Sequence, residues 1–519
     1  MKKLIGGVLM ALSATYLLTA CEYEQKKYTH DPNCTCTCDC CVAARGESKD
    51  IDTDELIDLL GLDKFSDYSS NNSINVVAPN GGTGSELRNY IAALYDVEAS
   101  EGDTDFLRNG LRINWIDKTD VFTRVVERSH LENDYVLQSY ELVNFYNEVI
   151  DKKLVDICTY EESEYLYGVI DNKNLIDLGK EGLNFSNQFN FMKNAGKNSK
   201  GKQVGSGWAV APSFFSYNEQ IAKDIYGNDV SYEFMSNKIK NLVTLGGDAK
   251  NHGYNAFIGL DSFLIPYQWN STLELDGNKF YIDNELFDYY MEAKTFYENN
   301  YITSSNESYY TWGIEWGKVY PTTLLTYSCS WFPKWCLEDY TRVLDLDETP
   351  QFKAVGLDEK YASCWGGQLM FATSRIKESL DKKNFVIDFI SKTTTDYNTM
   401  LNVNPNRLCP NNTLAVDALA NDEVPFDESY VFPKYFGGQN IYKACKKTLD
   451  NIDNHQPKSW MFWALSDELI QAYFNRIIIN EGRADEIVGS FINKAKTNYN
   501  IDILYDEDYV VIGDTIEYK

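Results

Sequence analysis

From about Ser73 onward, short β-branched runs alternate with helical segments, and no other property of the chain narrows its fold as sharply. Ile74-Asn-Val-Val77 has the composition of a buried strand, and apolar residues recur at helical spacing from Leu87 to Leu94. A second apolar run, Leu154 to Tyr160, follows another helical segment. Strands that alternate with helices are typical of layered α/β proteins. We therefore predict an α/β fold.

Polar residues follow both predicted strands. Thr83 and Glu86 lie in and just after the glycine-rich turn that follows the first strand, and Glu161 follows the second. In open α/β sheets, ligands bind beyond the carboxyl ends of the strands, and a helix N-terminus offers free backbone N–H groups. These residues are predicted to share one rim of the sheet, although helix capping explains them equally well.

The N-terminus has the pattern of a secretory signal. Lys2 and Lys3 precede an apolar stretch, 4–18, that is short for a membrane span. Leu18-Thr-Ala-Cys21 resembles a bacterial lipobox, which implies that residues 1–20 are removed and that Cys21 carries a lipid. The alternative is an ordinary secreted protein with a free Cys21. No later stretch approaches 18 uninterrupted apolar residues, so the lipid would be the anchor.

Residues 21–72 are rich in charged and small side chains and predict a flexible tether. This tether contains Cys34-Thr-Cys-Thr-Cys-Asp-Cys-Cys41, which holds five of the 12 cysteines. Dense thiolates can bind a soft metal, but structural zinc sites add a second ligand pair elsewhere, and the sequence offers none. We assign no metal. Oxidation, cross-linking between chains and a variable linker are the other interpretations.

The segment 201–227 begins with Gly201-Lys-Gln-Val-Gly205 and ends with Tyr217-Asn218 and, nine residues later, Gly227. It resembles the crossover segment of the extracellular solute-binding proteins of family 1, written G-K-x-Y-G-x-P and then Y-N-K-x-L-x-x-x-G. Tyr217-Asn218 and Gly227 match this pattern, whereas Gly207-Trp208 replaces its proline.

Two further segments resemble the same family in the expected order. Gly366-Gly-Gln-Leu-Met-Phe-Ala-Thr-Ser374, with the helical pattern after it, looks like the family's glycine-led strand and following helix. Trp460-Met-Phe-Trp463 and the later Gly482-Arg-Ala-Asp-Glu-Ile487 are similar to its C-terminal elements. The resemblance covers roughly residues 73–500.

This resemblance implies a two-lobe, type II periplasmic-binding-protein-like fold with a ligand cleft between the lobes and closure by hinge motion. It also implies the transmembrane permease subunits of an ABC importer as partners. We expect lobe 1 to contain residues 73–212 and 367–425, and lobe 2 to contain residues 213–366 and 426–519.

A saccharide ligand needs flat aromatic side chains for stacking and polar groups for its hydroxyls, and the chain has 10 Trp, 37 Tyr and 26 Phe. Carried over segment by segment, the resemblance makes eight residues candidates for the cleft. They are Thr83, Glu86, Glu161, Trp208, Trp331, Trp365, Gly366 and Trp463. Each tryptophan also fits packing in the core or at the hinge.

Catalytic patterns are scarce. The four histidines lie in no metal-binding or triad pattern, and no G-x-S-x-G turn occurs. The formal net charge of −29 argues against nucleic acid as a partner. We therefore predict a non-enzymatic, lipid-anchored solute-binding protein on the extracytoplasmic face of the membrane, without a cofactor, that captures a mono- or oligosaccharide. A surface glycosidase-like enzyme and a noncatalytic glycan-binding adhesin are the alternatives.

Overall fold

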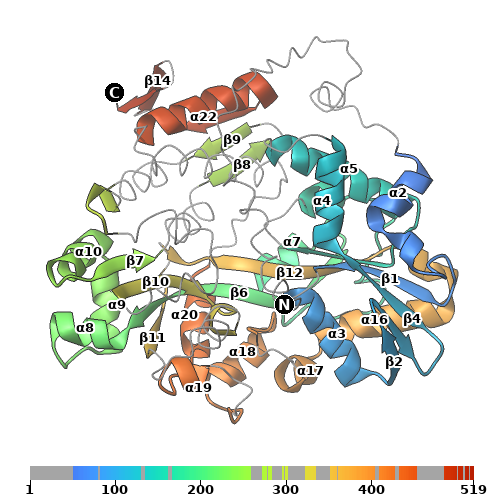
Figure 1. The fold of residues 1–519 in the computed structure, drawn as a ribbon, viewed down its shortest axis with the longest axis horizontal. Helices are drawn as coiled ribbons and strands as arrows, with labels where there is room; N and C mark the ends of the chain where they lie inside the picture. The colour runs from blue at the N-terminus through green and yellow to red at the C-terminus, as the bar shows by residue number, and fades with distance from the viewer. Residues whose placement is uncertain are drawn as a thin grey trace, which may run out of the picture.

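The computed structural model (Figure 1) describes most of the chain after residue 50. The described residues are 51–79, 82–129, 135–161, 166–258, 272–276, 279–282, 295–296, 298–301, 322–334, 351–358, 361–403, 408–426, 432–452, 484–499, 501–505, 509–512 and 515–518.

A ten-stranded sheet organises these residues, in the order β2-β3-β4-β1-β5-β12-β6-β10-β7, with β11 also paired to β6. Its strands are β1 (Ser73–Ala78), β2 (Val97–Glu101), β3 (Thr104–Leu107), β4 (Arg112–Asp117), β5 (Ile157–Glu161), β6 (Gly205–Asn218), β7 (Asn255–Ile258), β10 (Thr323–Cys329), β11 (Phe352–Gly356) and β12 (Cys364–Ala372).

Helices cover both faces of the sheet (Figure 1). On the side of β1 to β5 they are α2 (Thr53–Leu60), α3 (Gly82–Leu94), α4 (Lys118–Ser129), α5 (Tyr135–Asp151), α6 (Leu166–Val169), α7 (Asn190–Ala195), α16 (Leu380–Thr394) and α17 (Tyr397–Asn402). On the side of β7, β10 and β11 they are α8 (Glu219–Tyr226), α9 (Tyr232–Ile239), α10 (Leu242–Asn251), α18 (Thr413–Ala420), α19 (Phe432–Tyr435) and α20 (Tyr442–Asn451). Two 3₁₀ turns, Leu62–Lys64 and Ser374–Glu378, complete the set.

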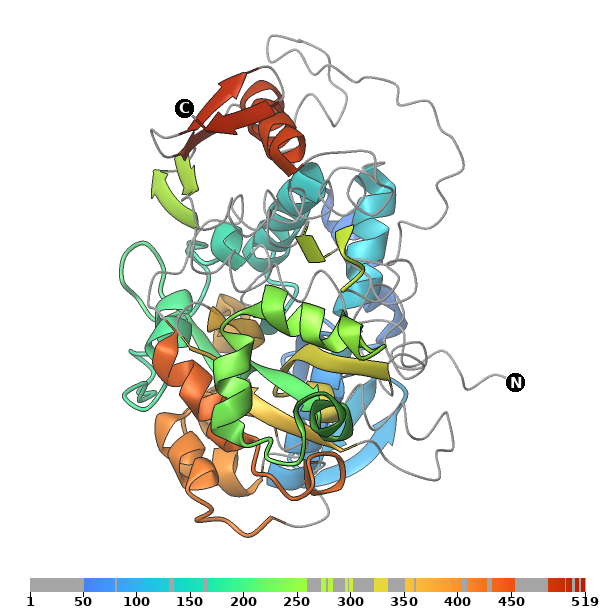
Figure 2. The same cartoon turned by 90° about the vertical axis from the view of Figure 1, so that its left-hand side faces the viewer.

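Smaller elements lie apart from the main sheet, as both views show (Figures 1 and 2). They are the sheet β13-β9-β8, with β8 (Thr272–Asp276), β9 (Lys279–Ile282) and β13 (Asp502–Tyr505), the hairpin of β14 (Tyr509–Ile512) and β15 (Thr515–Tyr518), and the helix α22 (Ala484–Tyr499).

The long strand β6 joins the two halves of the sheet. It is 14 residues long and buried throughout. Up to Pro212 it pairs with β12, and from Ser213 onward it lies between β10 and β11. Proline has no N–H to donate to a ladder, so Pro212 stands where the strand changes partners.

The core consists of two apolar clusters, of which one lies within one half of the sheet and the other spans both halves. One apolar cluster lies between β1, β4, α3 and α16, and includes Ile74, Trp115 and Phe389. The second cluster extends from α2, α4 and α5 into the half of the sheet that contains β7, β10 and β11. Layers of helices on both faces of a mixed sheet confirm the predicted α/β class.

Residues 51–72, which the sequence assigns to the tether, are folded. Leu56, Leu59 and Leu60 of α2 are buried against the second cluster, because their spacing places them on one face of the helix. Arg128 of α4 forms an ion pair with Glu55, which fixes the outer side of α2. The lobe boundaries themselves stay a prediction, as does the tether before residue 51.

The second predicted strand begins three residues later than the apolar run suggests. Lys153 has a positive φ of 56°, and the N–H of Leu154 donates to the carbonyl of Val149 at 3.1 Å. This geometry terminates α5, so Leu154 and Val155 belong to a buried connection and β5 begins only at Ile157.

Candidate ligand-binding site

The carboxyl ends of three neighbouring parallel strands meet at one edge of the sheet. β1 pairs in parallel with β4, with Ala78 opposite Asp117, and also with β5, with Val77 opposite Cys158. Residues that follow Ala78, Asp117 and Cys158 therefore lie along the same rim. This is the place where open α/β sheets bind ligands.

The strand β12 brings a second group of residues to this rim. It runs antiparallel to β5 and β6, so that Gln368 stands opposite Glu161 on one side and opposite Ala209 on the other. Ser330, which follows β10, donates from its hydroxyl to the carbonyl of Val210 at 3.1 Å. Glu161, Gln368 and Ala209 therefore lie in one row across β5, β12 and β6. Ser330, the residue before Trp331, continues this row beyond the end of β10.

A β-bulge interrupts β12 beside this row. Cys364 pairs with Pro212 and Gly367 pairs with Val210, so two residues, Trp365 and Gly366, stand opposite one. Gly366 has a φ of 92°, a conformation that L side chains rarely adopt. Bulges redirect side chains and are frequent beside binding sites. The glycine at this position is therefore required by the backbone.

The predicted site residues fall into two groups in the structure. Glu161, Trp365 and Gly366 are brought together on adjacent strands. Trp331 follows the end of β10 at the crossing, which is our name for residues 209–213 of β6, where this strand passes from one half of the sheet to the other. For Glu161 and Trp365 this placement rests on the backbone register, because the structure describes only the backbone of these two residues.

The other candidates are spread over the rim, the core and residues that the structure does not describe. The backbone of Thr83 lies at the start of α3, beside the carboxyl end of β1 and so on the same rim, and Glu86 is buried on that helix. Trp208 is only 2 % exposed and packs in the cluster between β1 and α16. Trp463 and Cys21 fall outside the described residues. The assignment of all eight residues to a ligand stays a prediction.

Lys118 is a rim residue that sequence reasoning missed. It is the first residue of α4, directly after β4, and is 6 % exposed with its Nζ 5.4 Å from the centre of the Tyr160 ring. The sequence contains an indication of this position, because the apolar run Ile113-Asn-Trp-Ile116 is followed by the polar residues Asp117-Lys118, just as the apolar run before Glu161 is. A buried cation held against an aromatic ring is a hydrogen-bond donor at the rim.

The buried thiol of Cys158, near this rim, is unsuited to nucleophilic chemistry. Burial raises the pKa of the Cys158 thiol to about 12, although the hydroxyl of Tyr160 and the charge of Lys118 oppose the shift. A thiol with such a pKa stays protonated at neutral pH and is a poor nucleophile. Among the described residues, no three histidine, cysteine or acidic side chains gather to hold a metal ion.

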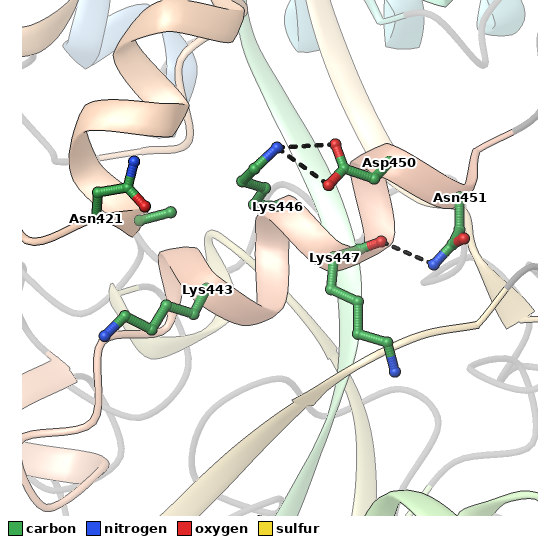
Figure 3. Close-up of a pocket in the computed structure, with 7 residues that line it drawn as sticks. Asn421, Lys443, Lys446, Lys447, Asp450 and Asn451 are labelled. Carbon is green, nitrogen blue, oxygen red and sulfur yellow. Dashed lines mark hydrogen bonds and ion pairs between the residues drawn. The ribbon is translucent and has the colours of Figure 1, made fainter.

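A shallow hollow of about 450 Å³ lies on the outer surface of α20, beside α18 (Figure 3). Its three lysines all have acidic partners. Lys443 pairs with Asp422 at 2.7 Å, Lys446 with Asp417 and Asp450 at 3.0 Å, and Lys447 with Asp358 at 2.8 Å. Because these charges are compensated, the hollow lacks the free cations that an anion site needs.

The fold is that of the extracellular solute-binding proteins. A crystal structure described as extracellular solute-binding protein family 1 superposes with a TM-score of 0.58 and 13% identity, covering 82% of this chain and 100% of the other. The resemblance seen in the sequence, and the predicted two-lobe α/β fold, are confirmed at the level of the fold.

Two sugar-bound structures share this fold. The galacto-N-biose/lacto-N-biose I-binding protein of an ABC transporter from Bifidobacterium longum has a TM-score of 0.52 and 12% identity over 83% of this chain and 98% of its own. Maltose-bound MalE3 from T. maritima has a TM-score of 0.54 and 12% identity over 82% and 99%. These neighbours are binding proteins.

No protein-family model and no curated protein matches the chain. None of the helices in the described ranges is long and apolar enough to cross a bilayer.

Proposed function

We propose that this protein is the solute-binding subunit of an ABC importer and that it captures a mono- or oligosaccharide without transforming it. The observation that carries the proposal is the convergence of the ends of β5, β12 and β10 on the middle of β6, at the crossing between the two halves of the sheet. The fold shared with sugar-binding proteins supports the same conclusion.

In this proposal the site works by binding energy alone. Trp365 and Trp331 supply aromatic faces for the apolar side of a sugar ring, and Glu161 accepts hydrogen bonds from its hydroxyls. A ligand that contacts residues on both sides of the crossing binds the closed arrangement more tightly than the open one. This differential affinity sets how far closure proceeds, and the closed form is delivered to the permease.

The first experiment screens sugars, oligosaccharides, amino acids and phosphorylated solutes by thermal shift with the full chain. A ligand at 100 times its dissociation constant stabilises the protein by about 2.7 kcal/mol, which raises the melting temperature measurably. A saccharide that stabilises the protein and is recovered unchanged supports the proposal. Its consumption would instead identify a glycosidase-like enzyme, and a panel without any stabilising ligand would favour an adhesin.

Substitutions then locate the ligand. Trp331→Ala and Glu161→Gln are expected to weaken sugar binding at least about tenfold in calorimetric titration, because stacking and charged hydrogen bonds each contribute more than a kcal/mol. Tyr232→Ala is the matched control, since Tyr232 is an aromatic residue on α9 that is 40 % exposed and belongs to none of the strands that form the site. Equal affinity in all three variants would remove Trp331 and Glu161 from the site.

We further propose that Cys21 carries a lipid that holds the protein at the outer face of the cell membrane. The support is the lipobox-like sequence Leu18-Thr-Ala-Cys21. Radiolabelled palmitate should be incorporated into the wild-type chain and not into Cys21→Ala, which should appear in the medium or in the soluble envelope fraction. Label on the variant, or an unlabelled wild-type chain, would contradict the anchor.

A further inference from the structure

Three buried cysteines surround the point where β6 changes partners. Cys364 stands opposite Pro212 in the ladder between β12 and β6. The carbonyl of Cys409 accepts the N–H of Val210 at 2.9 Å, and the next residue, Pro410, bridges to Ala209. Cys445 lies on α20. All three side chains are at most 1 % exposed, and none of the three forms a disulfide in the structure.

The helix α20 is fastened to the crossing from the other side. The hydroxyl of Thr448, one turn after Cys445, donates to the carbonyl of Ser213 at 2.7 Å and accepts the N–H of Leu357 at 3.0 Å. At Gly356 the backbone approaches α20 so closely that a Cβ atom there would lie 2.6 Å from the carbonyl oxygen of Ala444. The helix therefore follows the half of β6 that begins at Ser213.

Cys409 and Cys445 lie between these two attachments. Cys445 lies close enough to Cys409 to raise the pKa of its thiol, and Cys364 also raises it electrostatically. α18, which follows Cys409, packs against α20, and α20 packs against β6 and β11 (Figure 1). The two cysteines are 36 positions apart in the sequence, so a disulfide between them would join α20 to the segment that precedes α18.

We propose that Cys409 and Cys445 form a disulfide that links the two segments bound to β6 on either side of Pro212. Their two thiols lose two protons and two electrons, an S–S bond forms, and the electrons reduce an external disulfide, either glutathione disulfide or the active-site disulfide of a thiol oxidoreductase, to two thiols. The bond links the segment attached to β6 before Pro212 with the helix attached to it after Ser213. This inference is independent of the proposed ligand.

The burial of the pair decides when it reacts. Burial, together with the neighbouring thiols, raises the pKa of Cys409 well above its ordinary value, so little thiolate is present in the folded chain. Exchange is therefore slow in the native state and fast while the chain folds or opens locally. Once formed, the disulfide is shielded from reductants by the same burial.

The test maps the linkage in the full chain. Protein is equilibrated with a mixture of oxidised and reduced glutathione at two urea concentrations below the unfolding transition, alkylated, and digested with trypsin without reduction. We expect one linked species that joins peptide 408–434 to peptide 444–446. It should disappear on reduction and in Cys445→Ser. The oxidised wild-type chain should melt several degrees above the reduced one, and Cys445→Ser should show no such difference.

Two controls keep the test sharp. Cys158→Ser removes a buried thiol of β5 and should leave the linked species unchanged. A digest in which peptide 361–375, which contains Cys364, is joined to 408–434 would overturn the proposal, because it would identify a different pair. Alkylated Cys409 and Cys445 in both urea concentrations, with no linked peptide, would overturn it as well.

Discussion

Asp156 is the anion of a fully buried charge network at the start of β5. Its side chain is 0 % exposed and forms ion pairs with Arg375 and with Lys382, whose Nζ lies 3.4 Å from Oδ1. The other oxygen accepts the N–H of Asn75 at 2.8 Å. Two buried cations thus depend on one carboxylate.

Replacing Asp156 with Asn keeps the shape of the side chain and removes its charge. At a separation of 3.4 Å and an effective dielectric constant of about 20, the attraction between Asp156 and Lys382 is about 5 kcal/mol. The amide oxygen of Asn can still accept from Asn75, whereas Arg375 and Lys382 would be left as uncompensated buried cations. We expect Asp156→Asn to lower the free energy of unfolding by about 3–5 kcal/mol.

Urea unfolding measures this loss, and Asp450→Asn is its matched control. Asp450 makes the same kind of contact, 3.0 Å from Lys446, but its side chain is 57% exposed. The control should lose less than about 1 kcal/mol. Asp156→Asn with Lys382→Met should recover part of the loss, because one of the two stranded cations is then absent.

The pH dependence gives an independent check. Burial lowers the pKa of Lys382, and the charge of Asp156 opposes that effect. In Asp156→Asn the larger opposing charge is gone and only that of Glu378 remains, so the pKa of Lys382 in the folded chain falls further below its unfolded value. Between these two values the unfolded chain binds more protons, and stability rises with pH. The deficit of the variant should therefore shrink from pH 7 to pH 10. A loss no larger than that of Asp450→Asn, or one independent of pH, would refute the reasoning.

Three further predictions concern other parts of the fold. Burial opposes ionisation of Asp105, but hydrogen bonds from Arg88, Ser100 and Trp115 lower its pKa below the ordinary value. Asp105→Asn should therefore lower the free energy of unfolding by about 2–3 kcal/mol near neutral pH. That cost should be lost as pH falls through the lowered pKa, and melting temperatures of both proteins at pH 7 and pH 2.5 test it. Gly356→Ala should cost about 1–3 kcal/mol, because its Cβ would press on Ala444 of α20; an unchanged urea midpoint would contradict the close packing. Thr448→Val should cost a similar amount, about 1–3 kcal/mol, because the carbonyl of Ser213 and the N–H of Leu357 both lose their partner; equal midpoints for Thr448→Val and wild type would show that water replaces the hydroxyl.

The sequence predicts those parts of the fold that depend on local pattern. The strand at Ile74-Asn-Val-Val77 lies within β1, and the helical spacing from Leu87 to Leu94 lies within α3, because a short β-branched run and helical periodicity are both visible in a short window. Helix α2 was missed for the converse reason. Its single apolar group, Leu56 to Leu60, is embedded in charged residues, and only the packing against α4 and α5 gives it a buried face.

The rim of the candidate site could be predicted only in part. Glu161 and Gly366 are predicted as site residues because the end of a strand and a glycine-led strand can both be recognised in the sequence. That Gln368 stands opposite Glu161 depends on the order of strands in the sheet, in which β12 lies beside β5 although about 200 residues separate them. The buried position of Lys118 depends in the same way on the parallel pairing of β1 with β4.

The partner change in β6 places several kinds of connection at one point between the two halves of the sheet. At Pro212 the pairing with β12 ends, and from Ser213 the strand pairs with β10 and β11. Backbone hydrogen bonds cross this point, from the N–H of Ser213 to the carbonyl of Ser363 at 2.9 Å and from the N–H of Ser330 to the carbonyl of Pro212 at 3.2 Å. Buried hydroxyls add to them, since Ser363 donates to Ser213 at 3.3 Å and also bonds to the hydroxyl of Tyr327. Under the proposed function, a ligand held by residues of both halves would act across these bonds, and a disulfide beside them would limit how far the two halves move.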